Sequence, residues 1–150
     1  RLQVIEDSSG VKFVNDSLAT NPHATVSALQ ALTDGRVILL VGGADRGVDY
    51  QVLVDQVVAT PPMAILGLPD SGQRLIDQCG HALAKAGLAD VVVLEAVPGM
   101  IQAVARSREL ARAGDYVVLS PAAPSFGHYR DYAHRAEDFL NSIEQTKEGV

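Results

Sequence analysis

The sequence predicts an α/β domain with a mainly parallel sheet, and three observations lead to this class. Four short apolar runs are continuous rather than alternating, which is typical of strands buried on both faces of a parallel sheet. Segments with helical spacing separate these runs, and strands that alternate with helices are the pattern of α/β folds. A content of 47 % hydrophobic and 20 % charged residues in a chain of 150 supplies the core of one domain. We therefore expect about six strands with helices on both faces of the sheet.

The N-terminal segment predicts one antiparallel strand. The runs "LQVI" (2–5) and "VKFV" (11–14) flank "EDSSG", a short link rich in turn-forming residues. Two apolar runs joined in this way are typical of a β-hairpin. Because a hairpin makes one strand run against its neighbour, we place an antiparallel strand at the edge of the sheet.

The remaining elements alternate along the chain. The parallel strands are expected in the runs VILLV (37–41), MAILGL (63–68), VVVL (91–94) and YVVLS (116–120). Two segments between them, 71–87 and 99–114, carry apolar residues at three- and four-residue steps and predict helices. Gly87 and Gly114 are expected to end these helices, since glycine adopts the left-handed conformation of a helix C-terminus.

Charge and cysteine content narrow the classes of function. The net charge is −6, and the resulting pI near 5.0 argues against binding to nucleic acid, which requires basic patches. No apolar run approaches the roughly 20 residues that span a bilayer, so we expect no membrane insertion. The single cysteine, Cys79, excludes an internal disulfide and favours a reducing cytoplasm. The four histidines lack the spacing of metal ligands, and we expect no metal site.

Polar residues gather where three of the predicted strands end, the place where open parallel sheets bind ligands. The first such loop is "NDSLATNP", after the run VKFV. Asn21 or Thr20 is the expected N-cap of a helix that begins near Pro22, which accounts for part of the loop. Thr20 can also donate to a carboxylate held at that helix N-terminus. Helix capping leaves Asn15, Asp16 and Ser17 unexplained, and a carboxylate at a strand end can accept hydrogen bonds from a ribose or an amine.

The second loop is "GGADRGVDY" (42–50), after the run VILLV. Its glycines allow a close approach of the backbone to a ligand, and Arg46 offers a forked donor for a carboxylate or phosphate. A glycine turn with a solvated arginine is the simpler alternative, and the loop alone does not decide between them. The phosphate-binding pattern G-x-x-x-x-G-K-[ST] is missing from the chain, and the loop does not match the dinucleotide fingerprint G-x-G-x-x-G.

The third loop opens "SPAAPSFGHYRDYAHRAEDF" (120–139), after the last strand. Ser125, at the tip of an irregular segment with prolines and a glycine, is expected to bind an anion. Four later residues recur at helical steps and could instead form a core stripe, which we expect at least of the last one: Tyr129, Tyr132, Arg135 and Phe139. From these residues alone, the chain is an α/β domain whose strand-end loops bind a small anionic molecule.

Three segments, "NDSLATNPHA", "LLVGGADRGVDY" and "LSPAAPSFGHYRDYAHRAEDF", in this order and spacing, resemble the C-terminal domain of the Mur ligases, and most of all its glutamate-adding members. The resemblance covers nearly all of the 150 residues. It implies a Rossmann-like three-layer fold for residues 1–150, which would form the amino-acid-binding domain of a longer monomeric ligase. The UDP-sugar domain and the central ATPase domain would then lie outside this chain, which begins at Arg1 rather than Met. We expect ATP and Mg²⁺ to bind mainly to the missing central domain, and this fragment alone to be inactive.

The resemblance also implies a reaction and a set of binding residues. Glutamate would be added to UDP-N-acetylmuramoyl-L-alanine, whose carboxyl group is first activated as an acyl phosphate. The positions that match the family's glutamate-binding residues are Thr20, Arg46, Ser125, Phe126 and Tyr132. The positions that match its ATP-binding residues are Arg1, Asn15 and Asp16. The resemblance implies no catalytic residue and no metal ligand within this chain.

Two departures from the family pattern bear on the substrate. Leu18 stands where the family's S-K-A-T-N pattern has lysine, and Arg46 stands where its glycine loop ends in lysine. D-glutamate is the family default, but an L-glutamate-adding branch exists, and the two changes leave the stereochemistry open. A non-catalytic nucleotide- or amino-acid-binding module is the main alternative. A dinucleotide-dependent oxidoreductase is disfavoured by the missing fingerprint.

Overall fold

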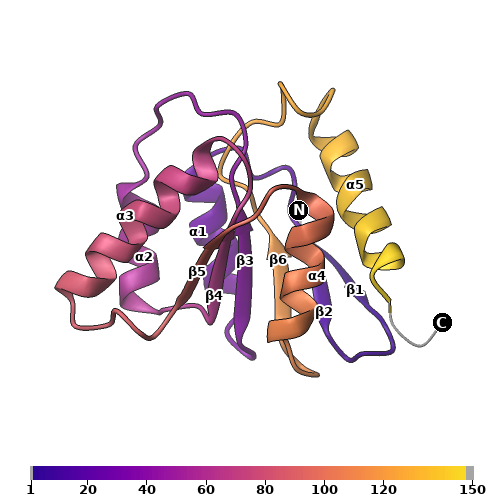
Figure 1. The fold of residues 1–150 in the computed structure, drawn as a ribbon, viewed down its shortest axis with the longest axis horizontal. Helices are drawn as coiled ribbons and strands as arrows, with labels where there is room; N and C mark the ends of the chain where they lie inside the picture. The colour runs from indigo at the N-terminus through magenta and orange to yellow at the C-terminus, as the bar shows by residue number, and fades with distance from the viewer. Residues whose placement is uncertain (1, 148–150) are drawn as a thin grey trace.

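A computed structural model describes residues 2–147 of the chain, and Figure 1 shows its strands and helices. Six strands form one sheet in the order β1-β2-β6-β3-β4-β5. Their bounds are β1 (Gln3–Glu6), β2 (Lys12–Asn15), β3 (Val37–Val41), β4 (Ala64–Gly67), β5 (Val93–Ala96) and β6 (Tyr116–Leu119). Only the β1–β2 pair is antiparallel, and the other four pairs of the described sheet are parallel. The predicted hairpin at the sheet edge and the predicted fold class are both confirmed.

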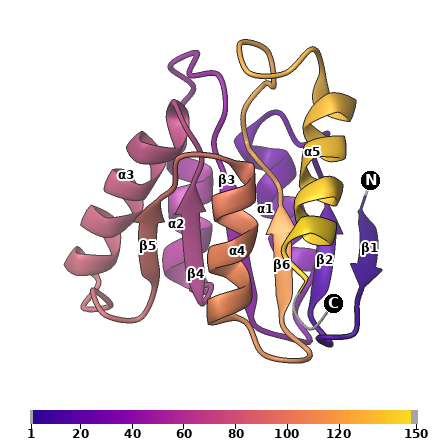
Figure 2. The ribbon, with the colours of Figure 1, turned by 45° about the vertical axis from the view of Figure 1, so that its right-hand side comes forward.

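Five helices complete the described chain: α1 (Pro22–Ala31), α2 (Gln51–Ala59), α3 (Ser71–Lys85), α4 (Met100–Leu110) and α5 (Tyr132–Gln145). Residues of α2 and α3 share one core cluster, and residues of α4 and α5 share the other. Helix α1 packs beside α2. Figure 2 shows α4 and α5 together on the near side of the sheet. The domain therefore has three layers, with helices on both faces. Within residues 2–147, every helix falls short of the length and apolarity that a membrane span requires.

The central strand β3 is buried on both faces, as its continuous apolar run predicts. Leu39 belongs to the cluster that contains Leu53 of α2, and Leu40 to the cluster that contains Phe139 of α5. All four side chains are fully buried. Burying such a side chain contributes about 1.5–3 kcal/mol, so the alternation of faces along β3 stabilises both helical layers at once.

Strand β5 differs from its prediction in position and in burial. The expected strand 91–94 is shifted by two residues, because pairing with β4 begins where Ala64 meets Val93. Val91 instead belongs to a turn, where its N–H donates to Leu88 O, and it is 52 % exposed. The side chains of β5 are half-buried or exposed. The expectation of burial on both faces is wrong here because β5 is an edge strand.

The two predicted helix ends have different outcomes. Helix α3 ends at Lys85, and Gly87 follows with φ +77°, in keeping with the predicted glycine stop. Helix α4 ends at Leu110, so the prediction that Gly114 ends it is wrong. Gly114 has φ +93° and donates its N–H to Gly10 O at 2.9 Å, which places it in the turn that leads into β6.

Candidate functional site

The carboxyl ends of the parallel strands meet at one edge of the sheet, where three loops gather. These loops, 16–21, 42–50 and 120–131, are called the strand-end loops below. They follow β2, β3 and β6, which are neighbours in the sheet although β6 is far along the chain. Three backbone hydrogen bonds join them: Ala122 N–H to Ala19 O (2.9 Å), Gly42 N–H to Pro121 O (2.9 Å) and Ala44 N–H to Pro124 O (3.0 Å). The structure thus brings together the three segments that the sequence analysis selected.

Asn15, the last residue of β2, uses its side chain for hydrogen bonds within the fold. Its Nδ2 donates to Gln3 Oε1 at 2.9 Å, and its Oδ1 accepts from the N–H of Ser17 at 3.2 Å. These bonds hold the hairpin and the turn that follows it. The predicted nucleotide contact of Asn15 stays a prediction, as does that of Arg1, which lies outside the described residues.

Asp16 lies below the loop surface, where 7 % of the residue is exposed. Its Oδ2 accepts from Ser120 Oγ at 2.8 Å, and Ser120 Oγ lies 3.1 Å from Thr25 Oγ1. Burial raises the pKa of the Asp16 carboxyl, and the Ser120 hydrogen bond opposes the rise. Asp16 also borders a groove of about 290 Å³, lined further by Leu2, Leu18, Ala19, Ala24, Ser27 and Ala28. Asp16 is therefore one of the residues that line a mainly apolar groove beside β2.

The start of α1 distinguishes the two candidate caps. Asn21 is the N-cap, since its Oδ1 accepts from the N–H of Ala24 at 3.0 Å, and Pro22 occupies the first helical position. Thr20 is therefore not the cap, and its exposed side chain lies just before the helix N-terminus. Positive partial charge at that terminus favours an anion near Thr20.

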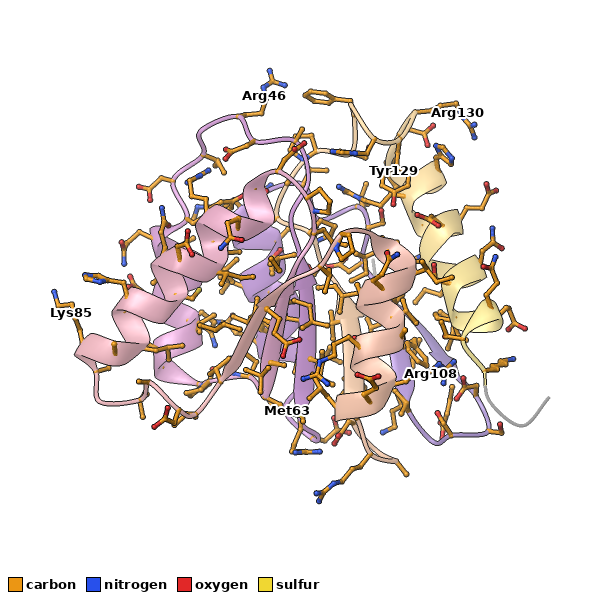
Figure 3. The ribbon with its side chains drawn as sticks, viewed as in Figure 1. Arg46, Met63, Lys85, Arg108, Tyr129 and Arg130 are labelled. Carbon is orange, nitrogen blue, oxygen red and sulfur yellow. The ribbon has the colours of Figure 1, made fainter. Side chains whose placement is uncertain are left out.

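Arg46 is exposed at the tip of the second loop, as Figure 3 shows. Its guanidinium carbon lies 5.0 Å from the ring centre of Phe126, a cation–π distance. Phe126 is itself 47 % exposed, so the pair joins the tips of the second and third loops at the surface. The loop is anchored from below by Arg74 of α3, whose Nη2 lies 2.8 Å from Asp45 Oδ1. Arg46 is thus held against a partner ring but keeps its N–H donors available to a ligand.

The third loop leads into α5, whose first residue is Tyr132. Asp131 caps the helix by accepting from the N–H of His134 at 2.8 Å. Tyr132 is 48 % exposed, whereas Ser125 is 9 % exposed. The prediction of a core stripe holds for Phe139, which is fully buried and packs edge-to-face on Phe13 with ring centres 6.3 Å apart. Tyr132 is the member of the stripe that stays at the loop surface.

Arg135 is the residue that sequence reasoning missed. Only 1 % of it is exposed. Its Nε donates to Ser17 Oγ (3.0 Å), its Nη2 to Ser17 O (2.6 Å) and its Nη1 to Ala123 O (2.9 Å). Ser17 Oγ in turn donates to Tyr132 O at 2.7 Å. Arg135 thereby ties the first loop, the third loop and α5 together. The available signal was a charged residue one turn before Phe139, on a stripe that otherwise faces the core. Burying a charge costs free energy unless the charge is paired or hydrogen-bonded, so a charge at such a position requires an explanation.

The described part of the chain contains no cluster of metal-ligating side chains. Within residues 2–147 no three His, Cys, Asp or Glu side chains lie close enough together to hold an ion. Thr20 and Ser125 supply hydroxyl groups in the strand-end loops, Arg46 supplies positive charge at their surface, and Arg135 of α5 lies buried beside them.

Comparisons with known proteins identify the family to which this chain belongs. The family model described as "Mur ligase, glutamate ligase domain" matches residues 1–123. A UDP-N-acetylmuramoyl-L-alanine–L-glutamate ligase of Micromonospora sp. is 44 % identical over 146 residues, which are 97 % of this chain and 30 % of that protein. A UDP-N-acetylmuramoylalanine–D-glutamate ligase of Desulfosudis oleivorans is 39 % identical over 150 residues, 99 % of this chain and 30 % of that protein.

Solved structures show the same fold at low sequence identity. A murein peptide ligase from Psychrobacter arcticus 273-4 superposes with a TM-score of 0.58 at 14 % identity, over 94 % of this chain and 29 % of that one. A ligase domain from Haemophilus ducreyi 35000HP gives a TM-score of 0.59 at 14 % identity, over 95 % of this chain and 99 % of that one. This chain spans about 30 % of the length of the curated relatives it matches. With a family model matching most of its length, the chain belongs to the Mur ligases as their glutamate ligase domain, the C-terminal domain that its loop motifs resemble.

Proposed function

We propose that this chain is the amino-acid-binding domain of an ATP-dependent ligase that joins glutamate to UDP-N-acetylmuramoyl-L-alanine. The observation that carries the proposal is that hydrogen bonds join the three strand-end loops and so gather hydroxyl and guanidinium groups at one edge of the sheet. The chain that forms this sheet matches the glutamate ligase domain of the Mur ligases. Glutamate carries two carboxylates, and a site for it requires donors and positive charge of this kind.

Arg46 is proposed to hold one carboxylate of the glutamate. A guanidinium binds a carboxylate through two parallel N–H donors, so an arginine at a loop tip orients its ligand as well as attracting it. The stacking on Phe126 restrains the side chain before the ligand arrives, which lowers the entropy lost on binding. Thr20 at the start of α1 and Ser125 on the facing loop supply hydroxyl donors. Tyr132 and Phe126 supply apolar walls.

We propose L-glutamate rather than D-glutamate as the substrate. The relatives from Micromonospora and Salinispora tropica, at 44 % and 42 % identity, are both named L-glutamate ligases, whereas the Desulfosudis D-glutamate ligase is at 39 %. Leu18 and Arg46 change the cations that face the ligand, and a mirror-image amino acid requires donors in changed positions. This choice departs from the family default.

The nucleotide is proposed to approach the groove beside Asp16. The residues that line that groove are apolar except Asp16 and Ser27, a composition that suits a nucleoside with hydrogen-bonding hydroxyls. The phosphates and Mg²⁺ would be held by the central domain of the longer protein, and the whole enzyme is expected to be a cytoplasmic monomer. ATP supplies the phosphoryl group that activates the acid. The residues of this chain contribute by binding and orienting glutamate against that activated acid.

The test is Arg46→Ala in the full-length ligase, with Arg112→Ala as the control. Arg112 is also an exposed arginine, but it precedes β6 and so lies at the opposite edge of the sheet. Loss of an exposed charge-assisted pair is expected to raise the KM for glutamate about tenfold, which corresponds to about 1.4 kcal/mol. The KM for ATP should stay within about twofold in both variants. A KM for glutamate that is unchanged with both enantiomers would show that Arg46 does not bind the substrate. Faster turnover of D-glutamate than of L-glutamate would contradict the assignment of L-glutamate as the substrate.

A further inference from the structure

Three polar side chains form a buried network behind the first strand-end loop. They are Asp16, directly after β2, Thr25 of α1, and Ser120, directly after β6. Thr25 and Ser120 are fully buried, and 7 % of Asp16 is exposed. Ser120 Oγ donates to Asp16 Oδ2 at 2.8 Å and lies 3.1 Å from Thr25 Oγ1. The network therefore joins three elements, one of which lies far along the chain from the other two.

The chemistry of the three groups orders them. An ionised carboxylate only accepts hydrogen bonds, and a hydroxyl has one proton to donate. The Ser120 proton is therefore directed at Asp16. The Thr25 hydroxyl donates to Ser120 O at 3.1 Å, which restrains the backbone that carries the Ser120 hydroxyl. Thr25 thus supports Ser120, and Ser120 holds the Asp16 carboxylate.

Neither hydroxyl is required by the element to which it belongs. Ser120 already donates its backbone N–H to Leu40 O at 3.2 Å, which continues the pairing of β6 with β3. Thr25 is a β-branched residue inside a helix, where alanine is more favourable. Burying a hydroxyl costs free energy that its hydrogen bond only offsets. Residues that break local preferences in this way point to a requirement on the group they hold, which is Asp16.

Asp16 is the member of the network that reaches a groove. It lines the groove of about 290 Å³ beside α1, to which the helix contributes Ala24, Ser27 and Ala28. Among the described residues, Thr25 and Ser120 are not part of that lining. A ligand in the groove would therefore contact Asp16 but not the two hydroxyls behind it.

We propose that Ser120 and Thr25 are positioning residues for the nucleotide, because they hold the carboxylate of Asp16 in place at this groove. The inference rests on the proposed function, in which the nucleotide approaches the groove beside Asp16. A carboxylate rotates about its side-chain bonds unless a partner restrains it, and a group that is restrained before binding loses less entropy when the ligand arrives. Hydroxyl groups of a nucleoside would then donate to Asp16 in charge-assisted hydrogen bonds.

The test measures the KM for ATP and for glutamate in the full-length ligase with Ser120→Ala, Asp16→Ala and both changes together. Ser120→Ala should raise the KM for ATP about fivefold, because Asp16 loses a hydrogen bond to its charged group. The KM for glutamate should stay within about twofold. Asp16→Ala should raise the KM for ATP about tenfold. Adding Ser120→Ala to Asp16→Ala should then change the KM for ATP by less than about twofold, since a positioning residue has no effect without the group it holds.

Thr25→Val and Thr25→Ser form a matched pair, since valine keeps the shape of the side chain and serine keeps its hydroxyl. Thr25→Val should raise the KM for ATP about twofold to threefold, and Thr25→Ser should leave it at the wild-type value. Ser107→Ala is the structural control. Ser107 is fully buried, and its Oγ donates to Ala103 O at 2.7 Å within α4, which packs in the other core cluster. That variant should lower the unfolding temperature and leave both KM values unchanged.

The outcomes separate the positioning role from the reaction. A rise in the KM for ATP that Ser120→Ala causes equally with and without Asp16 would overturn the positioning role. Should Ser120→Ala not fold, equal KM values for ATP in Thr25→Val and Thr25→Ser would overturn it as well. An unchanged KM for ATP in Asp16→Ala would refute the nucleotide groove, and the inference with it. A wild-type enzyme that uses neither enantiomer of glutamate would instead refute the proposed function.

Discussion

Gly72→Ala is expected to destabilise this domain, although replacing glycine by alanine in a helix usually stabilises it. Gly72 lies in the first turn of α3, where the helix starts against the end of β4. A Cβ added there would lie 2.7 Å from the carbonyl carbon of Gly67 and 3.2 Å from Val41 O. The backbone of α3 therefore lies directly against the backbone of β3 and β4 at this point, below the second strand-end loop.

The two opposing contributions can be compared. Alanine gains at most about 1 kcal/mol of helix propensity over glycine. Overpacking of a well-packed site costs about 1–3 kcal/mol, and here the contacted atoms belong to buried strands that cannot rotate away. The net loss should be about 1–2 kcal/mol. For a domain of this size that lowers the unfolding temperature by about 2–8 °C.

Gly80→Ala in the same helix is the matched control. Its Cβ would meet only Leu94 Cδ1, at 3.3 Å, the free end of a half-buried side chain that can shift. Gly80→Ala should therefore be neutral or stabilising by up to about 1 kcal/mol. Urea unfolding of the chain followed by circular dichroism measures both variants, with the slope against urea expected to stay unchanged. A Gly72→Ala variant as stable as the wild type would refute the close approach of α3 to β4.

Two further outcomes follow from buried ionisable groups. Burial alone would raise the pKa of Asp7, but hydrogen bonds from Ser9 and Arg108 outweigh it and hold the pKa below the usual 3.8. The ion pair should therefore stabilise the fold above about pH 4 and lose this contribution as the pH falls through the lower folded-state pKa. Asp7→Asn should cost about 3 kcal/mol near pH 7 and flatten this acid slope in urea titrations, and an unchanged slope would contradict the pairing. Cys79 is fully buried, and burial raises its pKa to about 12. Iodoacetamide should thus modify it only as fast as the domain unfolds, and labelling at the rate of a free cysteine would count against that burial.

Much of the fold could be predicted because its signals are local. The run VILLV forms β3 at residues 37–41, and a strand with no polar residue over five positions fits only the middle of a sheet. The hairpin follows from two apolar runs joined by turn-forming residues, and the three loops follow from polar residues placed directly after strands. The rule that parallel strands end at one edge of a sheet then brings those loops together.

Other features depended on contacts between distant segments. Helix α2 carries Val52, Val54, Val57 and Val58, and such β-branched residues weaken the helical signal. Burial of Leu53, Val54 and Val57 against the sheet stabilises the helix all the same. Strand β5 was misplaced because its bounds are set by pairing with β4, a partner that the local sequence does not specify.

The sequence by itself determined the fold class, the antiparallel edge, the three loops and the resemblance to the Mur ligases, because each depends on residues that are adjacent or regularly spaced. Only the tertiary structure decided that β6 lies between β2 and β3, which places residues 120–126 beside the first two loops. It also decided the burial of Arg135 without an acid. The spacing of α5 puts that residue on the core-facing side, but the neutrality of its surroundings is a property of the loops that close over it.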